Sequence, residues 1–361
     1  MKTTKKLFSI LLTIALITAI LPIGVFTVSA ETEGYYTYEV LNDEATITGC
    51  DTSISGDITI PSTLGGYPVT SIGNFAFEYC SNLASITIPD SVASIGNEAF
   101  YGCKSLTNIT IPDSVTSIGI RAFSRCSNLT SITIPNSITR IEVNAFAYCS
   151  SLASIKIPDS VTSIGNYAFY ECISLTSITI PDKVTSIGDS AFFSCESLTS
   201  ITIPDSVTSI GGWAFYCCYN LTRVAIGNSV TSIGSWAFYG CESLTSINIP
   251  DSVTSIEDYA FGDCYALSDV YYSGTEKQWE NIVIGEENDY LLNANIHYNY
   301  TGNEAVTGDT NDDGEINVLD AISLRNGIIG KEAHSETADM NGDLVFDIYD
   351  LLILKAMIFK G

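Results

Sequence analysis

The chain has 361 residues and a formal net charge of −26 at pH 7, because 41 acidic residues outnumber 15 lysines and arginines. Such acidity argues against nucleic acid and anionic lipid as partners, since both are negatively charged and repel the chain. Cations and basic surfaces are compatible with it, although solubility alone explains most of the charge.

The first 30 residues have the pattern of a secretory signal peptide. Lysines at the start of the chain precede an apolar run from Leu7 to Val28, and the run ends in small residues up to Ala30. This order of basic, apolar and small residues is typical of a cleaved leader. We predict cleavage after Ala30 and export of a soluble protein, because no later stretch is long and apolar enough to span a bilayer. An uncleaved membrane anchor is the alternative.

Residues 31–57 are predicted to form an N-terminal cap. Two segments of alternating character, 36–40 and 45–49, flank the turn residues Asn42 and Asp43, which is the pattern of a β-hairpin. A repeat array needs a cap of this kind, since its first repeat would otherwise expose an apolar edge.

A 23-residue repeat follows, over residues 58–270. Phenylalanine and leucine recur at this step from Phe77 to Phe261 and from Leu83 to Leu267. A fixed period of this length indicates a solenoid. Alternating apolar residues predict one short strand in each repeat, a second extended piece ends at glycine, and the Ala-Phe segment predicts a helical turn. Cysteine keeps the same interval at Cys80, Cys103, Cys126, Cys149, Cys172, Cys195, Cys218, Cys241 and Cys264.

One repeat reads PDSVTSIGNYAFYECISLTSITI over residues 158–180. This sequence resembles the BspA-type leucine-rich repeat, a 23-residue bacterial class. The resemblance implies an α/β repeat solenoid that is strand-rich and coils as a right-handed superhelix. It also implies a C-terminal cap over residues 271–300, after which residues 301–307 form a polar linker.

The cysteine column is predicted to be a ladder of buried thiols. Side chains at one repeat position should be parallel and about 5 Å apart, whereas a disulfide needs converging Cβ atoms about 3.8 Å apart. The thiols therefore act as small apolar residues, and metal binding by stacked thiolates is the minor alternative. Cys50 and Cys217 lie outside the column and have no predicted role.

Residues 308–361 carry two calcium-binding patterns that are 30 residues apart. Aspartate and asparagine supply the hard oxygen ligands that Ca²⁺ requires, at the spacing of a loop that wraps one ion, and an apolar helix follows each loop. Gly314 occupies the sharp turn of the first loop, but Leu344 replaces glycine in the second. The predicted ligand positions are Asp309, Asn311, Asp313, Glu315 (through its carbonyl), Asn317 and Asp320, and Asp339, Asn341, Asp343, Val345, Asp347 and Asp350.

The duplicated loop–helix resembles a dockerin. The resemblance implies a small all-α domain of two EF-hand-like motifs, two structural Ca²⁺ ions, and a cohesin domain of a cellulosome scaffold as partner. Apolar residues stand at loop positions where many dockerins carry serine or threonine, which suggests an apolar cohesin specificity. A solvated basic pair and core leucines are the alternative interpretation of the helices. The predicted cohesin contacts are Val318, Leu319, Arg325, Ile348, Tyr349 and Lys355.

An aromatic column is the candidate ligand surface of the solenoid. The position before the Ala-Phe pair varies between repeats, and three residues later a tyrosine often follows. In a helical turn this spacing would place both rings on one face, where they should stack and be at least half exposed. Protein binding, glycan binding and mutual packing of the rings remain open. The candidate residues are Tyr167, Tyr170, Trp213, Tyr216, Trp236 and Tyr239.

Catalysis is not expected. The aspartates after proline, such as Asp182 and Asp205, form a regular column without the distinct acid and nucleophile environments that glycoside hydrolysis needs. The only histidines, His297 and His334, have no nucleophile motif around them. The sequence therefore predicts a secreted, non-catalytic, cellulosome-associated protein in polysaccharide degradation, whose solenoid recognises protein or carbohydrate. A surface-displayed adhesin or inhibitor is the first alternative, and a polysaccharide hydrolase is the second.

Overall fold

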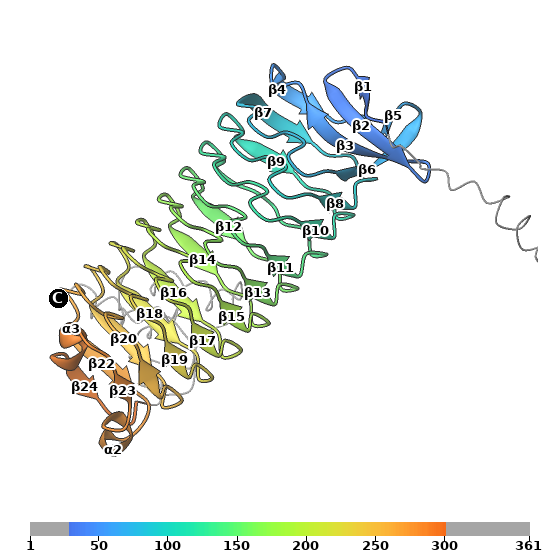
Figure 1. Cartoon of the computed structure of the whole chain (residues 1–361). Helices are drawn as coiled ribbons and strands as arrows, with labels where there is room; N and C mark the ends of the chain where they lie inside the picture. Colours follow the sequence, from blue (N-terminus) through green and yellow to red (C-terminus); the bar gives the residue numbers. More distant parts are fainter. Residues whose placement is uncertain (1–28, 301–361) are drawn as a thin grey trace, which may run out of the picture. The chain divides into compact units, whose positions relative to one another are not determined.

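The chain divides into two compact units, Met1–Thr139 and Arg140–Gly361, here called the N-terminal and C-terminal units. The computed structural model describes residues 29–300 of the chain. In each unit the strands are short and lie side by side as successive rungs (Figure 1). The predicted solenoid architecture is therefore confirmed.

The N-terminal unit begins with the predicted hairpin, in which β2 pairs antiparallel with β3 and β1 adds to β2. Its tight turn holds Asn42 and Asp43 at φ 53° and 62°, as a two-residue hairpin turn requires. The hairpin continues into the parallel order β3-β6-β8-β10, while β4-β7-β9 form a second parallel sheet and β5 pairs with β6. The strands are β1 (Glu31–Glu33), β2 (Tyr36–Leu41), β3 (Glu44–Cys50), β4 (Ser55–Thr59), β5 (Thr63–Leu64), β6 (Tyr67–Ile72), β7 (Asn82–Thr87), β8 (Ser94–Ile95), β9 (Asn108–Thr110) and β10 (Ser117–Ile118).

The C-terminal unit holds two longer parallel ladders, β11-β13-β15-β17-β19-β21-β23 and β16-β18-β20-β22-β24, with β12 paired to β14. The ladder strands are β11 (Arg140–Ile141), β12 (Ser154–Lys156), β13 (Ser163–Ile164), β14 (Ser177–Thr179), β15 (Ser186–Ile187), β16 (Ser200–Ile203), β17 (Ser209–Ile210), β18 (Arg223–Ile226), β19 (Ser232–Ile233), β20 (Ser246–Ile249), β21 (Ser255–Ile256), β22 (Asp269–Tyr272), β23 (Val283–Ile284) and β24 (Asn295–His297). Two four-residue helices, α2 (Glu276–Trp279) and α3 (Asp289–Leu292), lie between the last strands. Thr275 begins α2 with a capping box completed by Gln278.

The sequence period sets the register of these ladders. Ile164 lies opposite Ile187, and Ile187 lies opposite Ile210, so that equivalent residues of successive repeats become neighbours. Every apolar column of the sequence therefore becomes a stack of identical side chains in the core. Phe169 and Phe192 are fully buried with their ring centroids 5.3 Å apart.

The Ala-Phe segment does not form the predicted helical turn. Two residues of each segment have left-handed backbone, for example Tyr167 at φ 58° and Glu171 at φ 54°. Their amide hydrogens, and that of Phe169 between them, donate to carbonyls of the next repeat, whereas a helix would bond them within the segment. The segment is thus a series of tight turns that are themselves stacked in a ladder, and stacking between repeats overrides the local helical preference.

Candidate functional sites

Four rings of the C-terminal unit form a continuous stack, here called the aromatic ridge: Tyr170, Phe193, Tyr216 and Tyr239. Successive ring centroids are 4.6, 4.6 and 5.2 Å apart, and the ring planes are within 14° of parallel. The ridge is possible because the repeats carry its residues in register, one ring per rung. The faces of the inner rings are covered by their neighbours, which leaves mainly ring edges and hydroxyl groups at the surface.

The ridge is flanked by the variable residues that precede the Ala-Phe pair. Tyr167 contacts Tyr170 at 5.8 Å and Trp236 contacts Tyr239 at 4.7 Å between centroids, as predicted. The predicted contact between Trp213 and Tyr216 is absent, and Trp213 has no ring partner within residues 29–300. In place of that contact, Tyr216 approaches Trp236 of the next repeat at 6.4 Å.

The predicted exposure of these rings is too high. Trp213 is 43% exposed and Tyr167 is 40% exposed, while the other four candidate residues are half-buried. The reason is the stacking itself, since each ring removes surface from the next. Trp213, with no ring against it, is the candidate residue that offers the most aromatic surface.

The backbone at these flanking positions is strained. Trp213 and Trp236 have φ of 53° and 61°, in the left-handed region that bulky residues rarely occupy. Each such residue costs about 1 kcal/mol or more. The inter-repeat hydrogen bonds from Trp213 to Ser235 and from Trp236 to Asp258 hold the two residues in this conformation.

The tyrosines of the ridge stay neutral. A hydrogen bond from Tyr239 to Asp263, reinforced by burial, raises the pKa of this tyrosine well above its usual range. Burial first, and then the charge of Glu171, raises the pKa of Tyr170. The ridge therefore presents neutral phenols beside carboxylates, an arrangement suited to recognition by hydrogen bonds and apolar contact rather than to proton transfer at neutral pH.

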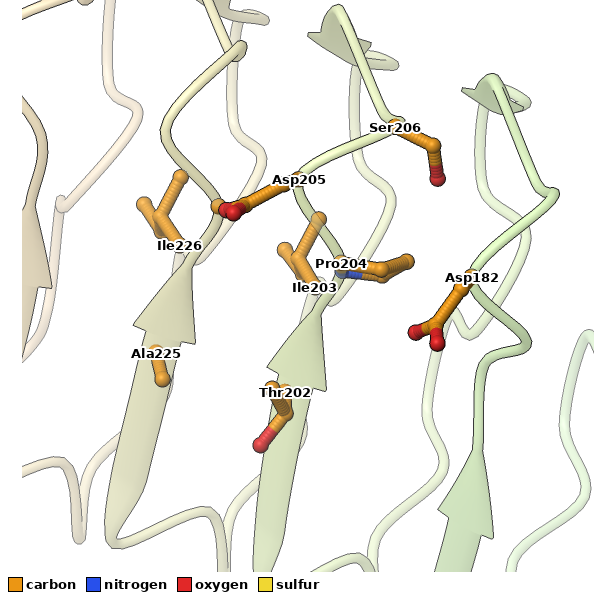
Figure 2. A pocket seen from close by; sticks show the side chains of 9 residues that line it. Asp182, Thr202, Ile203, Pro204, Asp205, Ser206, Ala225 and Ile226 are labelled. Atoms are coloured by element: carbon orange, nitrogen blue, oxygen red, sulfur yellow. The ribbon is translucent and has the colours of Figure 1, made fainter.

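A hollow of about 470 Å³ lies where β16 and β18 end. It forms where the repeat departs from its pattern, because Ala225 and Gly227 replace the usual threonine and proline. A Cβ on Gly227 would lie 2.4 Å from the carbonyl oxygen of Pro204, so the close approach of the two chains requires glycine. Figure 2 shows Asp182 and Asp205 on successive repeats at the edge of this hollow.

The aspartate column serves the backbone. Asp205 accepts a 2.7 Å hydrogen bond from the amide of Asn228 in the next repeat, which ties the turns of two repeats together. Asp182 and Asp205 are both exposed. They occupy equivalent positions of the repeat, so they lack the two different environments that an acid and a nucleophile need.

The cysteine column is a ladder of buried thiols, as predicted. The nine cysteines of the column are 0% exposed and are present as thiols. Cys195 donates to the carbonyl of Phe169 at 3.3 Å, and Cys241 donates to that of Phe215 at 3.3 Å. Burial raises the pKa of both thiols well above the usual value. They stay protonated and neutral, which disfavours nucleophilic or metal-binding roles.

Ser268, Asp269 and His297 make a cluster that the sequence did not indicate. Asp269 accepts hydrogen bonds from Ser268 at 2.7 Å and contacts His297 at 2.8 Å, and the bond with His297 is the main cause of a lowered Asp269 pKa. The serine bonds to the carboxylate and to the carbonyl of Thr245 rather than to the imidazole. A nucleophilic serine needs a base that accepts its proton, so this order of contacts does not activate Ser268.

Within residues 29–300, no three histidine, cysteine or acidic side chains converge as a metal site. No helix of that part of the chain is long and apolar enough to cross a membrane. The predicted calcium positions from Asp309 to Asp350, the predicted cohesin contacts from Val318 to Lys355, and His334 lie outside the described residues. The same holds for the predicted leader up to Val28.

Comparison with known families and structures is consistent with both sequence resemblances. The model of the BspA type leucine rich repeat region matches in six copies, over residues 52–174 and 162–285, and the type I dockerin model matches residues 307–359. A leucine-rich repeat protein of T. pallidum is 30% identical, with 54% of this chain and 91% of that chain covered and a TM-score of 0.49. A leucine rich cell surface protein of Faecalibacterium prausnitzii is 32% identical, with coverage of 71% and 97% and a TM-score of 0.34. The curated proteins contain no match to this chain.

Proposed function

The chain belongs to the BspA-type leucine-rich repeat family and carries a type I dockerin domain, and we propose that it is a secreted, non-catalytic component of a cellulosome. The observation that carries the proposal is the joining of these two modules in one chain. A dockerin is a cohesin-binding, calcium-binding module, and a leucine-rich repeat is a protein-interaction scaffold. One end then attaches the chain to a scaffold protein, and the solenoid presents a recognition surface.

The residues of the dockerin segment fit calcium. Positions 1, 3 and 5 of the two loops are filled by Asp309, Asn311 and Asp313 and by their counterparts 30 residues later, and all of these supply hard oxygen ligands. We infer that the twelve ligand positions predicted above hold two ions. Bound calcium would fix the loops, and the following helices with Arg325 and Lys355 would contact cohesin.

Capture by a panel of immobilised cohesins tests this attachment. The full chain should bind at least one cohesin in Ca²⁺, and EDTA should release it. The double variant Asp309→Ala/Asp339→Ala, which removes position 1 of both loops, should lose binding. Asp312→Ala is the matched control, because Asp312 occupies a loop position that is not a predicted ligand. Binding that is indifferent to EDTA, or no capture by any cohesin, would contradict the proposal.

We propose that the recognition surface of the solenoid is the aromatic ridge with Trp213, and that its ligand is a protein. Stacked neighbours cover the faces of Phe193 and Tyr216, whereas flat sugar rings bind to open aromatic faces. Edges, phenol groups and one exposed tryptophan resemble the centre of a protein interface instead. A binding screen of proteins and plant glycans should show loss of protein binding in Trp213→Ala. Binding of a glycan alone would contradict this proposal.

The proposal that the chain is non-catalytic has its own test. The contacts of Ser268 and the equivalent surroundings of Asp182 and Asp205 support the absence of catalysis. Purified chain incubated with plant polysaccharides should release no reducing sugar. Release above that of a heat-inactivated sample would favour the hydrolase alternative. Binding to host cells without any cohesin capture would favour an adhesin.

A further inference from the structure

The thiol ladder obeys one rule in the described residues. Each thiol donates to the carbonyl oxygen of the phenylalanine 26 residues earlier, as Cys103 does to Phe77 at 3.1 Å and Cys264 does to Phe238 at 3.2 Å. The acceptor always belongs to the preceding repeat. A thiol at the start of the ladder therefore has no phenylalanine to bond to.

Cys80 is that first thiol. The residue 26 positions before it is Ile54, next to the N-terminal hairpin, and no thiol-to-carbonyl bond of Cys80 is present within residues 29–300. A different partner takes this place. The thiol of Cys50, at the end of β3, is hydrogen-bonded to the thiol of Cys80.

The surroundings hold the two sulfurs together. Cys50 lies opposite Tyr36 in the β2-β3 pair, and the ring of Tyr36 packs edge-on against Phe77 at 6.2 Å. The amide of Cys80 bonds to the carbonyl of Phe77 at 3.1 Å. The same aromatic contact thus fixes both backbones, so that the thiols meet where the hairpin joins the first repeat.

We propose that Cys50 and Cys80 are a disulfide site, which covalently joins the N-terminal hairpin to the first repeat when the chain is exported. The proposal rests on export, which is part of the proposed function, because disulfides persist in oxidising compartments. The ladder thiols are parallel and keep to their carbonyls, whereas these two sulfurs face each other. Cys50 is half-buried and within reach of solvent, while Cys80 is fully buried.

The oxidant would be a small-molecule or protein disulfide. The thiolate of Cys50 attacks it, forms a mixed disulfide and releases one thiol. Cys80 then loses its proton and attacks the Cys50 sulfur, which breaks the bond to the oxidant and releases a second thiol. Two cysteine thiols are oxidised by two electrons, and one external disulfide is reduced to two thiols. The hydrogen bond from Cys50 lowers the pKa of Cys80, against the opposing effect of burial, and so supports the second step.

The other cysteine outside the column provides the control. Cys217 is half-buried like Cys50, but its thiol is hydrogen-bonded to the hydroxyl groups of Tyr216 and Tyr219. It therefore matches Cys50 in exposure without facing a second sulfur in the same way.

Thiol labelling of the purified full chain tests the proposal. After incubation with oxidised glutathione and denaturation, the chain should take up two fewer maleimide labels than after reduction, and a proteolytic digest should contain a linked Cys50–Cys80 peptide. The variant Cys50→Ser should show no such deficit, whereas Cys217→Ser should keep it. Oxidation should also raise the unfolding midpoint by about 5 °C.

Full labelling of the oxidised chain, or a linked peptide between any other cysteines, would overturn the proposal. The labelling of the unaltered chain decides this even where Cys50→Ser fails to fold. Because oxidation is carried out on purified chain without cohesin or calcium, its outcome is independent of whether the chain is exported and docks.

Discussion

The two units have the same backbone at the position before each Ala-Phe pair but different side chains there. In the N-terminal unit this left-handed position holds an ion pair, in which Arg121 bonds to Glu98 at 3.2 Å. In the C-terminal unit it holds stacked rings, such as Trp236 and Tyr259 with centroids 4.2 Å apart. In both cases residues one repeat apart pair with each other across the rungs (Figure 1).

This comparison separates what the fold needs from what a surface can vary. The fold needs the buried columns and the inter-repeat hydrogen bonds, which are the same in both units. The flanking position tolerates a charge or a ring because its backbone is held from outside, by bonds such as that of Glu98 to Ile120 and that of Trp236 to Asp258. Surface chemistry can therefore differ between units without any change of architecture.

Removal of a core ring should have the largest effect, and an equal one in both units. Phe169→Ala deletes a fully buried ring that stacks on Phe192 at 5.3 Å, and Phe100→Ala deletes one that stacks on Phe123 at 5.4 Å. Each should lower the free energy of unfolding by about 3–5 kcal/mol, measured by chemical denaturation. A cost confined to one unit would show that the shared core does not carry the stability of both.

The two tryptophans should differ in stability and in binding. Trp236→Ala removes a ring stacked between Tyr239 and Tyr259 and should destabilise the chain by about 1–2 kcal/mol. Trp213→Ala removes a ring without a ring partner in residues 29–300 and should cost less than about 0.5 kcal/mol. Chemical denaturation of both variants checks this order. An equal cost would contradict the stacking account of the ridge.

The periodic features were predictable from the sequence, because each constant column becomes a stack when equivalent residues are 23 apart in register. The left-handed turns were not, since Tyr167 and Trp213 are residues that rarely take positive φ, and only contacts with the next repeat hold them there. The hollow beside Gly227 depends on the approach of Pro204, a tertiary contact. The Cys50–Cys80 contact likewise joins a hairpin to a repeat, and spacing along the chain does not show it.

The ridge should respond to alkaline pH through Tyr239. Its hydrogen bond to Asp263 raises the folded-state pKa, so the contribution of this tyrosine to stability is fully present below about pH 10, the usual tyrosine pKa, and is lost as pH rises further. Tyr239→Phe should therefore be less stable than the unaltered chain at pH 7, by about 0.5–1 kcal/mol. The difference should shrink above pH 10 in denaturation series. A difference that grows with pH would contradict the sign of this linkage.

The smallest effect is expected at the ion pair of the N-terminal unit. The side chains of Arg121 and Glu98 are 50% and 22% exposed, so water and salt weaken their attraction. Arg121→Gln should lower the free energy of unfolding by no more than about 0.5 kcal/mol at low salt, and the difference should vanish at about 1 M salt, where the screening length is about 3 Å. Trp236→Ala is the reference, because stacking is not screened and its cost should persist at high salt. A salt-independent loss in Arg121→Gln would mean that the arginine acts by packing, as the rings do, and the contrast between the two surfaces would then be one of size rather than of physical kind.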